Sequence, residues 1–294
     1  MSTSTIDQDG LVKLETTKKA DGGGFRISLR VVVSYVLLLL IGAVYAGPLA
    51  MLVNTTFLTQ REFNRNAMTV PSEINFDNFE EAWERGNFPQ YMANSVFYAF
   101  SATAIYVISA VFVAFPIARG YIKGGNIVLT LFVIALFLPP ALIPQFQLIL
   151  NIGLYNTRPG YILLLITNPI GIIILVNYLK SLPRELDEAA AMDGCGYVRF
   201  LAYIVFPLAR PIIATVIVLH AIGIWNELIL ATIYLTNDNF YPITRGLLVF
   251  QGVYGSNWPV LASAVVLMSL PMVILFLFLQ RYIISGLTAG AVKE

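Results

Sequence analysis

Six long apolar stretches constrain this chain more than any other feature of its sequence. A helix needs about 20 apolar residues to cross the hydrocarbon of a bilayer, and each stretch reaches that length. With 57% hydrophobic and only 12% charged residues, the composition is typical of an integral membrane protein. We therefore predict an all-α membrane protein with six transmembrane helices, at about residues 31–53, 93–118, 127–150, 160–179, 207–233 and 259–281.

Lys and Arg residues are unevenly shared between the segments that connect these spans. With the N-terminus inside, thirteen of the 18 basic residues fall in inner segments and five in outer loops. Because inner loops of membrane proteins are enriched in Lys and Arg, both termini are predicted to be cytoplasmic. The same rule places residues 181–211, between spans four and five, in the cytoplasm.

The sequence divides into three regions by composition. Residues 1–24 are polar and glycine-ended, and we expect a disordered cytoplasmic tail. Residues 25–92 hold the first span and a long extracytoplasmic loop, where VPSEINFDNFEEAW predicts a turn followed by a short amphipathic helix. Residues 93–294 hold the remaining five spans.

The cytoplasmic segment contains ELDEAAAMDGCG, with four carboxylates in nine residues: Glu185, Asp187, Glu188 and Asp193. Pro183 suits the first turn of a helix, and Gly194 and Gly196 favour its end. A helix over 183–193 would be about 16 Å long, too short to cross a bilayer. At helical spacing Leu186, Ala189, Ala190 and Asp193 share one small, largely apolar face, and Arg184, Glu188 and Met192 mark another.

From the residues alone, this helix is a solvated surface helix or a docking surface. Four carboxylates without histidine, at helical offsets, lack the geometry of a metal site. Nothing apolar surrounds them to shift their pKa values for acid–base catalysis. Cys195, the single cysteine, is interpreted as a small packing residue. We predict no catalytic and no metal-ligating residue.

The pattern E-A-A-x-x-D-G stands here as Glu188, Ala189, Ala190, Asp193 and Gly194, and it resembles the signature loop of bacterial ABC-importer permeases. Phe200, Ile204, Pro207 and Pro211 continue the pattern, with Phe206-Pro207 in place of the usual Leu-Pro. Pro116 also departs from the Ala-Tyr-Ala run of the family. The C-terminal QRYIISGLTAGAVK (280–293) is similar to carbohydrate-uptake permeases of the six-span, maltose-transporter type. The resemblance covers about residues 25–294.

This resemblance implies a type I ABC-importer permease fold in a bacterial or archaeal plasma membrane. The helix between spans four and five would be a coupling helix that docks on a cytoplasmic ATPase. The docking residues would be Glu185, Glu188, Ala189, Ala190, Asp193, Gly194 and Pro207. The implied partners are a second, homologous permease, two ATPase copies, an extracytoplasmic sugar-binding protein and membrane lipid, but not nucleic acid.

The chain contains no G-x-x-x-x-G-K-[ST] phosphate-binding loop. We therefore predict that it is not an enzyme and holds no cofactor, and that the partner ATPase binds ATP and Mg²⁺. The expected function is import of a sugar by alternating access, with this chain forming half of the pathway. Alternatives are a permease for a polyol or glycerophosphodiester, or an ion-coupled secondary transporter.

Polar and helix-breaking residues inside the spans are candidates for the substrate pathway. Helix breaks are predicted at Pro139, Pro140, Pro169 and Pro271. Asn168, Trp225, Asn226 and Glu227 are pathway candidates, although Trp225 would equally suit an interfacial anchor. His220, the single histidine, is either a hydrogen-bonded packing residue or a proton relay.

Overall fold

The computed structural model describes residues 29–84, 87–252 and 255–291. The chain splits into two units, residues 1–50 and 51–294, and the description below concerns the second unit except where α1 is named. The predicted tail, residues 1–24, lies outside the described residues.

Helices make up most of the described chain. The long helices are α1 (Leu29–Thr56), α4 (Phe88–Arg119), α12 (Arg210–Trp225) and α15 (Trp258–Ala291). Those of intermediate length are α5 (Gly125–Ala135), α6 (Leu142–Asn151), α7 (Arg158–Leu165), α8 (Pro169–Lys180), α3 (Asp77–Glu84) and α9 (Glu185–Met192). The short ones are α2 (Gln60–Arg65), α10 (Tyr197–Phe200), α11 (Phe206–Leu208), α13 (Ile229–Tyr234) and α14 (Ile243–Gly246). A π-helical turn occupies Leu201–Val205, and 3₁₀ turns occupy Asp238–Phe240 and Leu247–Phe250.

Two strands in the described residues, β1 (Gln251–Gly252) and β2 (Gly255–Ser256), form a small antiparallel pair. The predicted turn and short helix of the long loop are confirmed, because α3 begins at Asp77 within the stretch VPSEINFDNFEEAW.

Three described helices are long and apolar enough to cross a membrane: Val31–Thr56 of α1, α4 and Trp258–Gln280 of α15. Two bent pairs raise that number to five if each pair is one span: α7 with α8, bent by 50°, and Tyr197–Leu208 with α12, bent by 84°. The predicted third span, 127–150, is not one helix. It is divided into α5 and α6, and α5 alone, 11 residues long, rises only about 16 Å.

The predicted break at Pro271 is wrong, because α15 runs from Trp258 to Ala291 with this proline inside it. By contrast, Pro139 and Pro140 lie in the gap between α5 and α6, and Pro169 is the first residue of α8. A proline ends a helix only where no neighbouring group can take over the freed carbonyl, so membrane helices often continue through it.

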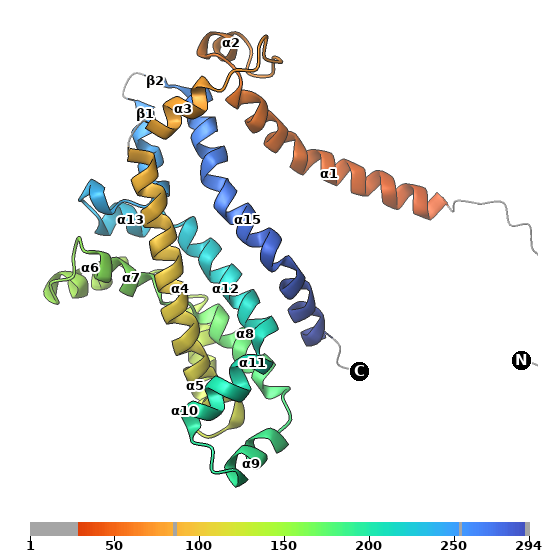
Figure 1. Cartoon of the computed structure of the whole chain (residues 1–294), viewed down its shortest axis with the longest axis vertical. Coiled ribbons are helices and arrows are strands. Elements are labelled where there is room, and N and C mark those ends of the chain that lie inside the picture. The colour runs from red at the N-terminus through yellow and green to blue at the C-terminus, as the bar shows by residue number, and fades with distance from the viewer. Residues whose placement is uncertain (1–28, 85–86, 253–254, 292–294) are drawn as a thin grey trace, which may run out of the picture. The chain divides into compact units, whose positions relative to one another are not determined.

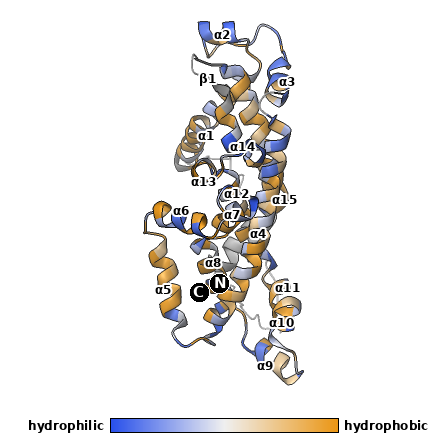
Figure 2. Cartoon of the chain, turned by 90° about the vertical axis from the view of Figure 1, so that its left-hand side faces the viewer, coloured by the Kyte–Doolittle hydropathy of each residue, from blue (hydrophilic) through white to orange (hydrophobic). Residues whose placement is uncertain are grey.

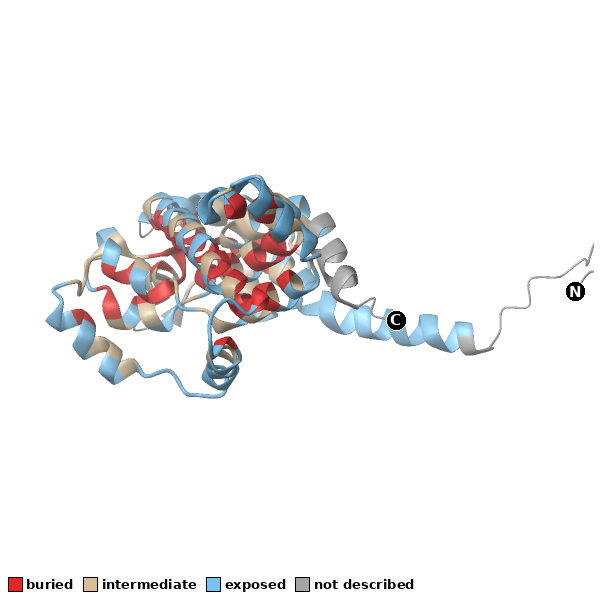
Figure 3. Ribbon diagram, turned by 90° about the horizontal axis from the view of Figure 1, so that it is seen from below, coloured by how far each residue is buried: buried red, intermediate tan, exposed pale blue. Residues whose placement is uncertain are grey.

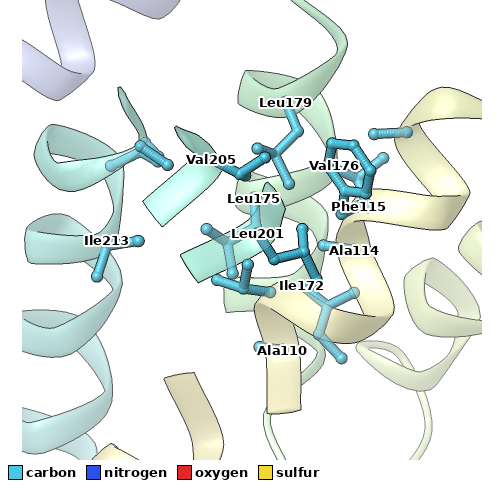
Figure 4. Close-up of a cluster of buried hydrophobic side chains, with 14 of the residues drawn as sticks. Ala110, Ala114, Phe115, Ile172, Leu175, Val176, Leu179, Leu201, Val205 and Ile213 are labelled. Atoms are coloured by element: carbon cyan, nitrogen blue, oxygen red, sulfur yellow. The ribbon is translucent and has the colours of Figure 1, made fainter. Parts of the chain in front are cut away.

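The core of the second unit forms where α4 packs against α8 and the π-helical turn. Figure 4 shows the side chains of α4 (Ala110, Ala114, Phe115), α8 (Ile172, Leu175, Val176, Leu179) and the turn (Leu201, Val205) lying against one another. The three alanines at four-residue spacing on α4 (110, 114, 118) are buried in this cluster. Their small side chains let α8 approach α4 closely, so this stripe serves the chain's own packing.

Within the second unit, α9 lies at one end, while α2, α3 and the β1–β2 pair lie at the opposite end (Figure 1). Figure 2 shows hydrophilic residues at α2, α3 and α9 and hydrophobic residues along α4, α5 and α15 between them. The buried residues gather inside the helix bundle (Figure 3). The distribution matches an apolar middle region with a polar region at either end.

Candidate functional site

The α9 segment is the first candidate site, and its helix is shorter than predicted. It begins at Glu185, so Pro183 lies in the preceding turn rather than in the helix. At its other end Gly194 adopts a left-handed backbone, φ 66°. The amide of Cys195 donates to the Ala190 carbonyl at 2.9 Å and the Gly194 amide to the Ala191 carbonyl at 3.1 Å. This pair of bonds is the Schellman motif, which ends a helix sharply at glycine.

The two faces of α9 differ from the predicted ones. Leu186 and Asp187 are half-buried and Ala190 is buried, whereas Ala189 and Asp193 are exposed. Ala190, one of the predicted docking residues, is 5% exposed and belongs to the chain's own core cluster, so its side chain lies on the inward face. The exposed face carries Glu185, Glu188, Ala189 and Met192.

Asp187, one of the four carboxylates but not a predicted docking residue, makes the contact that joins the segment to α4. Its Oδ2 lies 2.8 Å from Nε of Arg119, the last residue of α4, in an ionic contact that lacks hydrogen-bond geometry. The Arg119 guanidinium also donates to Asp187 Oδ1 at 3.1 Å, to the Leu182 carbonyl at 2.7 Å and to the Pro183 carbonyl at 3.1 Å. Tyr121 donates its hydroxyl to Asp187 at 3.0 Å.

Burial, and then the neighbouring Asp187 carboxylate, raise the pKa of Tyr121 above its ordinary value of 10.0. The phenol therefore stays protonated at neutral pH and remains a hydrogen-bond donor to Asp187. Pro207, the last predicted docking residue, lies apart from α9 in sequence and structure. It is the second residue of helix α11, which follows the π-helical turn, and it is half-buried.

The break between α7 and α8 is the second candidate site. The side chain of Asn168 accepts from the Ile170 amide at 3.0 Å and so caps α8. The backbone carbonyl of Asn168 accepts from the Tyr106 hydroxyl at 2.5 Å. Asn168 is thus the capping residue of α8.

His220 lies beside this break and is buried. Its Nε2 lies 3.1 Å from the Leu165 carbonyl, and its Nδ1 lies 3.2 Å from the Thr103 hydroxyl. A carbonyl only accepts, so Nε2 carries the proton, and Nδ1 accepts from Thr103. Both ring nitrogens are hydrogen-bonded to neighbouring groups, which fits the packing interpretation of His220.

The three outer pathway candidates each hydrogen-bond a backbone group of the chain. Trp225 is 3% exposed, and its indole donates to the Met268 carbonyl at 3.2 Å. Asn226 donates to the Ile222 carbonyl at 2.8 Å, within its own helix turn. Glu227 accepts from the Leu230 amide at 2.8 Å, so it caps α13. These bonds join Trp225 to α15 and hold the side chains of Asn226 and Glu227 within their own turns.

Trp225 also lines a pocket of about 530 Å³ between α4, α12 and α15. Its lining is almost wholly apolar: Val96, Ala99, Phe100, Thr103, Ala104, Val107, Ile108, Phe206, Ile213, Ile217, Ala221, Trp225, Pro271, Met272 and Leu275. Sugar sites need several convergent hydrogen-bonding groups to hold the hydroxyls. This pocket supplies one, Thr103, so it lacks the convergent polar groups that would hold a sugar.

Comparison with known proteins agrees with this geometry. The family described as "Binding-protein-dependent transport system inner membrane component" matches residues 84–288. The melibiose/raffinose/stachyose import permease protein MelC of Bacillus subtilis is 31% identical over 84% of this chain and 91% of its own length. The arabinooligosaccharides transport system permease protein AraQ of Halalkalibacterium halodurans is 32% identical over 84% of this chain and 90% of its own length.

A solved structure shares the fold. It is a chain of a bacterial ABC transporter involved in the import of the acidic polysaccharide alginate, with a TM-score of 0.80 and 22% sequence identity over 89% of this chain and 99% of that one. The family match extends from the end of α3 through α9 into α15. This chain belongs to the family of binding-protein-dependent transport system inner membrane components.

Proposed function

We propose that this chain is one of two permease subunits of an ABC importer for an oligosaccharide or related sugar. Its relatives import melibiose, raffinose and stachyose, or arabinooligosaccharides, and its structural neighbour belongs to an alginate importer. An extracytoplasmic sugar-binding protein would deliver the substrate, and two copies of a cytoplasmic ATPase would drive transport. A homologous permease would supply the other half of the pathway.

In this proposal the six spans are α1, α4, α5 with α6, α7 with α8, α12 with α13, and α15. Both termini and α9 then lie in the cytoplasm, in keeping with the excess of Lys and Arg on that side. The tail of residues 1–24 would be cytoplasmic, and residues 93–294 would form the permease core with the loop 181–211.

The observation that carries the coupling role is the division of α9 into two faces. One face is built into the chain's own core through Ala190 and Asp187, and the other presents Glu185, Glu188 and Met192 outside the bundle. Met192 is 89% exposed, which is unusual for a large apolar side chain on a helix that already has a core face. We propose that the exposed face seats in a groove on the ATPase, with the carboxylates bonded to its basic or backbone donors.

Glu188→Lys tests this role, with Glu73→Lys as the matched control. Both glutamates are exposed, but Glu73 lies in the long loop at the opposite end of the second unit. Like-charge contact in an interface costs several kcal/mol, so Glu188→Lys should lower sugar uptake and ATPase co-purification at least about tenfold. Glu73→Lys should leave ATPase co-purification unchanged.

The measurement uses tagged chain expressed in its native cells, where the partner subunits are present. Uptake is measured with a panel of labelled oligosaccharides, a polyol and a glycerophosphodiester, with and without a protonophore. Uptake of the polyol or glycerophosphodiester alone would replace the sugar assignment. Protonophore-sensitive uptake with equal ATPase recovery from both variants would contradict the ABC-importer proposal.

A further inference from the structure

We infer that the Arg119–Asp187 pair is a latch that fixes α9 to the end of α4 and thereby orients its docking face. The inference rests on the proposed function and names the residues that position the docking helix. The two residues are 68 positions apart in sequence, yet they join the end of one spanning helix to a helix outside the bundle.

The latch is buried although α9 is a peripheral helix. The side chain of Arg119 is 3% exposed and that of Asp187 is 11% exposed. Arg119 lies over the ring of Phe115, 5.6 Å from its centroid, which further fixes the guanidinium plane. A planar guanidinium that bonds several acceptors at once holds them in one geometry, which a lysine point charge does not.

Arg119 bonds both the turn before α9 and the first turn of α9 itself. Its bonds to the Leu182 and Pro183 carbonyls hold the turn that leads into α9, and its contact with Asp187 holds the first turn of the helix. Both the position of the helix start and the rotation of the helix about its axis are therefore set from α4. A single contact would leave that rotation free.

The rotation decides which residues face outward. Successive residues of a helix are about 100° apart, so with Asp187 pointing to α4, Glu185, Ala189 and Met192 lie about 140–200° away. Glu188 lies about 100° away, at the edge of the same face. All four are exposed, and among the described residues the structure gives neither glutamate an ion-pair partner. Asp187 is thus the carboxylate of the cluster that bonds within this chain, through Arg119.

The latch also lets a movement of α9 be transmitted to α4. The backbone joins α9 to α8 on one side and to α10 on the other, but α4 has no backbone link to it. Through Arg119, a displacement of α9 would reach α4, which carries Tyr106 and Thr103 beside the break in the α7–α8 span. Loss of the latch should let the ATPase move α9 without moving α4.

Spin labels measure the latch directly. Ile122 and Ala191 are exposed residues near the two partners and outside the proposed docking face, and each is replaced by a labelled cysteine in a Cys195→Ser background. In the assembled importer, the wild-type latch should give one narrow distance distribution. Asp187→Asn should broaden it at least twofold, and Glu73→Gln, which changes an exposed carboxylate outside the docking face, should leave it narrow.

A neutral double variant separates positioning from folding. Asp187→Asn alone leaves the Arg119 charge buried and unpaired, so it can reduce the amount of folded protein. Arg119→Met/Asp187→Asn removes both charges and keeps packing on Phe115. We expect normal abundance and ATPase co-purification, a broadened distance distribution, and at least threefold more ATP hydrolysed per sugar imported.

A narrow distribution, or an unchanged ATP-to-sugar ratio, in the double variant would overturn the latch. If the double variant does not fold, Tyr121→Phe replaces it in the experiment. This change removes one exposed donor to Asp187 and should broaden the distance distribution to a smaller extent. Failure of the proposed function looks different: the wild-type chain would import no sugar, while the distances would still respond to Asp187.

Discussion

The imidazole of His220 stacks on the ring of Tyr106, with centroids 4.1 Å apart and planes 11° apart. Each ring also bonds a carbonyl in the broken span: Tyr106 that of Asn168, and His220 that of Leu165. Two helices, α4 and α12, thereby hold the ends of α7 and α8 at their 50° bend. The bend is maintained by side chains that are remote in sequence from it.

Replacement of His220 by leucine should destabilise the protein without a direct effect on substrate affinity. The change removes the hydrogen-bond partner of the Leu165 carbonyl and of the Thr103 hydroxyl. Leaving a buried polar group without a partner lowers the free energy of unfolding by about 1–3 kcal/mol. Thermal unfolding of the purified protein in detergent measures the loss. In a double-mutant cycle with Thr103→Val, the two losses should be less than additive; full additivity would show that the bond contributes nothing.

Gly171 should not tolerate a side chain, because a Cβ there would lie 2.3 Å from the Tyr106 hydroxyl oxygen. Gly171→Ala is expected to destabilise by about 1–3 kcal/mol, as overpacking does. Tyr106→Phe in the same chain should recover part of that loss, since the closest atom is then absent. Gly223→Ala is the matched control: its Cβ would have no atom within 4 Å, and helix propensity should make it neutral or stabilising. Equal effects at both glycines would refute the contact.

Two neighbouring alanines of α9 should respond oppositely to the same enlargement. Ala190→Leu forces a larger side chain into the core cluster and should reduce stability by about 1–3 kcal/mol. Ala189→Leu adds its bulk outside the bundle, so stability should be unchanged while ATPase co-purification falls. Unfolding temperature and ATPase recovery, measured on both variants, distinguish the two; a destabilised Ala189→Leu would show that its side chain is not outward.

The loop between α1 and α3 should open in acid. Hydrogen bonds from Ser72, then from Thr59, lower the pKa of Glu62 from its ordinary 4.5 to about 2. Because this pKa is depressed in the folded state, the stabilisation is complete above about pH 4.5 and is lost as the pH falls toward 2. Protease cleavage within residues 66–76 should rise over that interval in the wild type. Glu62→Gln should make cleavage independent of pH there, and a persisting pH step would assign the effect to another group.

The sequence predicted the spans well where one local property decides them. Apolar length indicated α1, α4 and α15, since only apolar residues are stable in hydrocarbon. Paired proline at 139–140 and Asn168-Pro169 coincide with gaps between helices, because proline removes a donor and Asn offers a cap. Pro271 did not break its helix, and the local sequence does not distinguish it from the others.

Residues whose roles depend on distant partners were not predictable in this way. The face of α9 was assigned from its own spacing, but Arg119 on α4 selects the rotation by pairing with Asp187. Trp225 was interpreted as a pathway residue or an interfacial anchor, and its indole instead donates to the Met268 carbonyl on α15, 43 positions away. No pattern within one helix reports such contacts; in the sequence, Arg119 counted only as one of the basic residues of an inner segment.

The two faces of α9, a helix of eight residues, imply two different patterns of compensating substitution. A substitution at Leu186, Asp187 or Ala190 can be compensated by a second substitution in the same gene. On the proposed docking, a substitution at Glu185, Glu188, Ala189 or Met192 can be compensated only in the gene for the ATPase. Exchange of these outward residues alone, with the inward ones kept, should therefore decide which relative's ATPase this chain accepts.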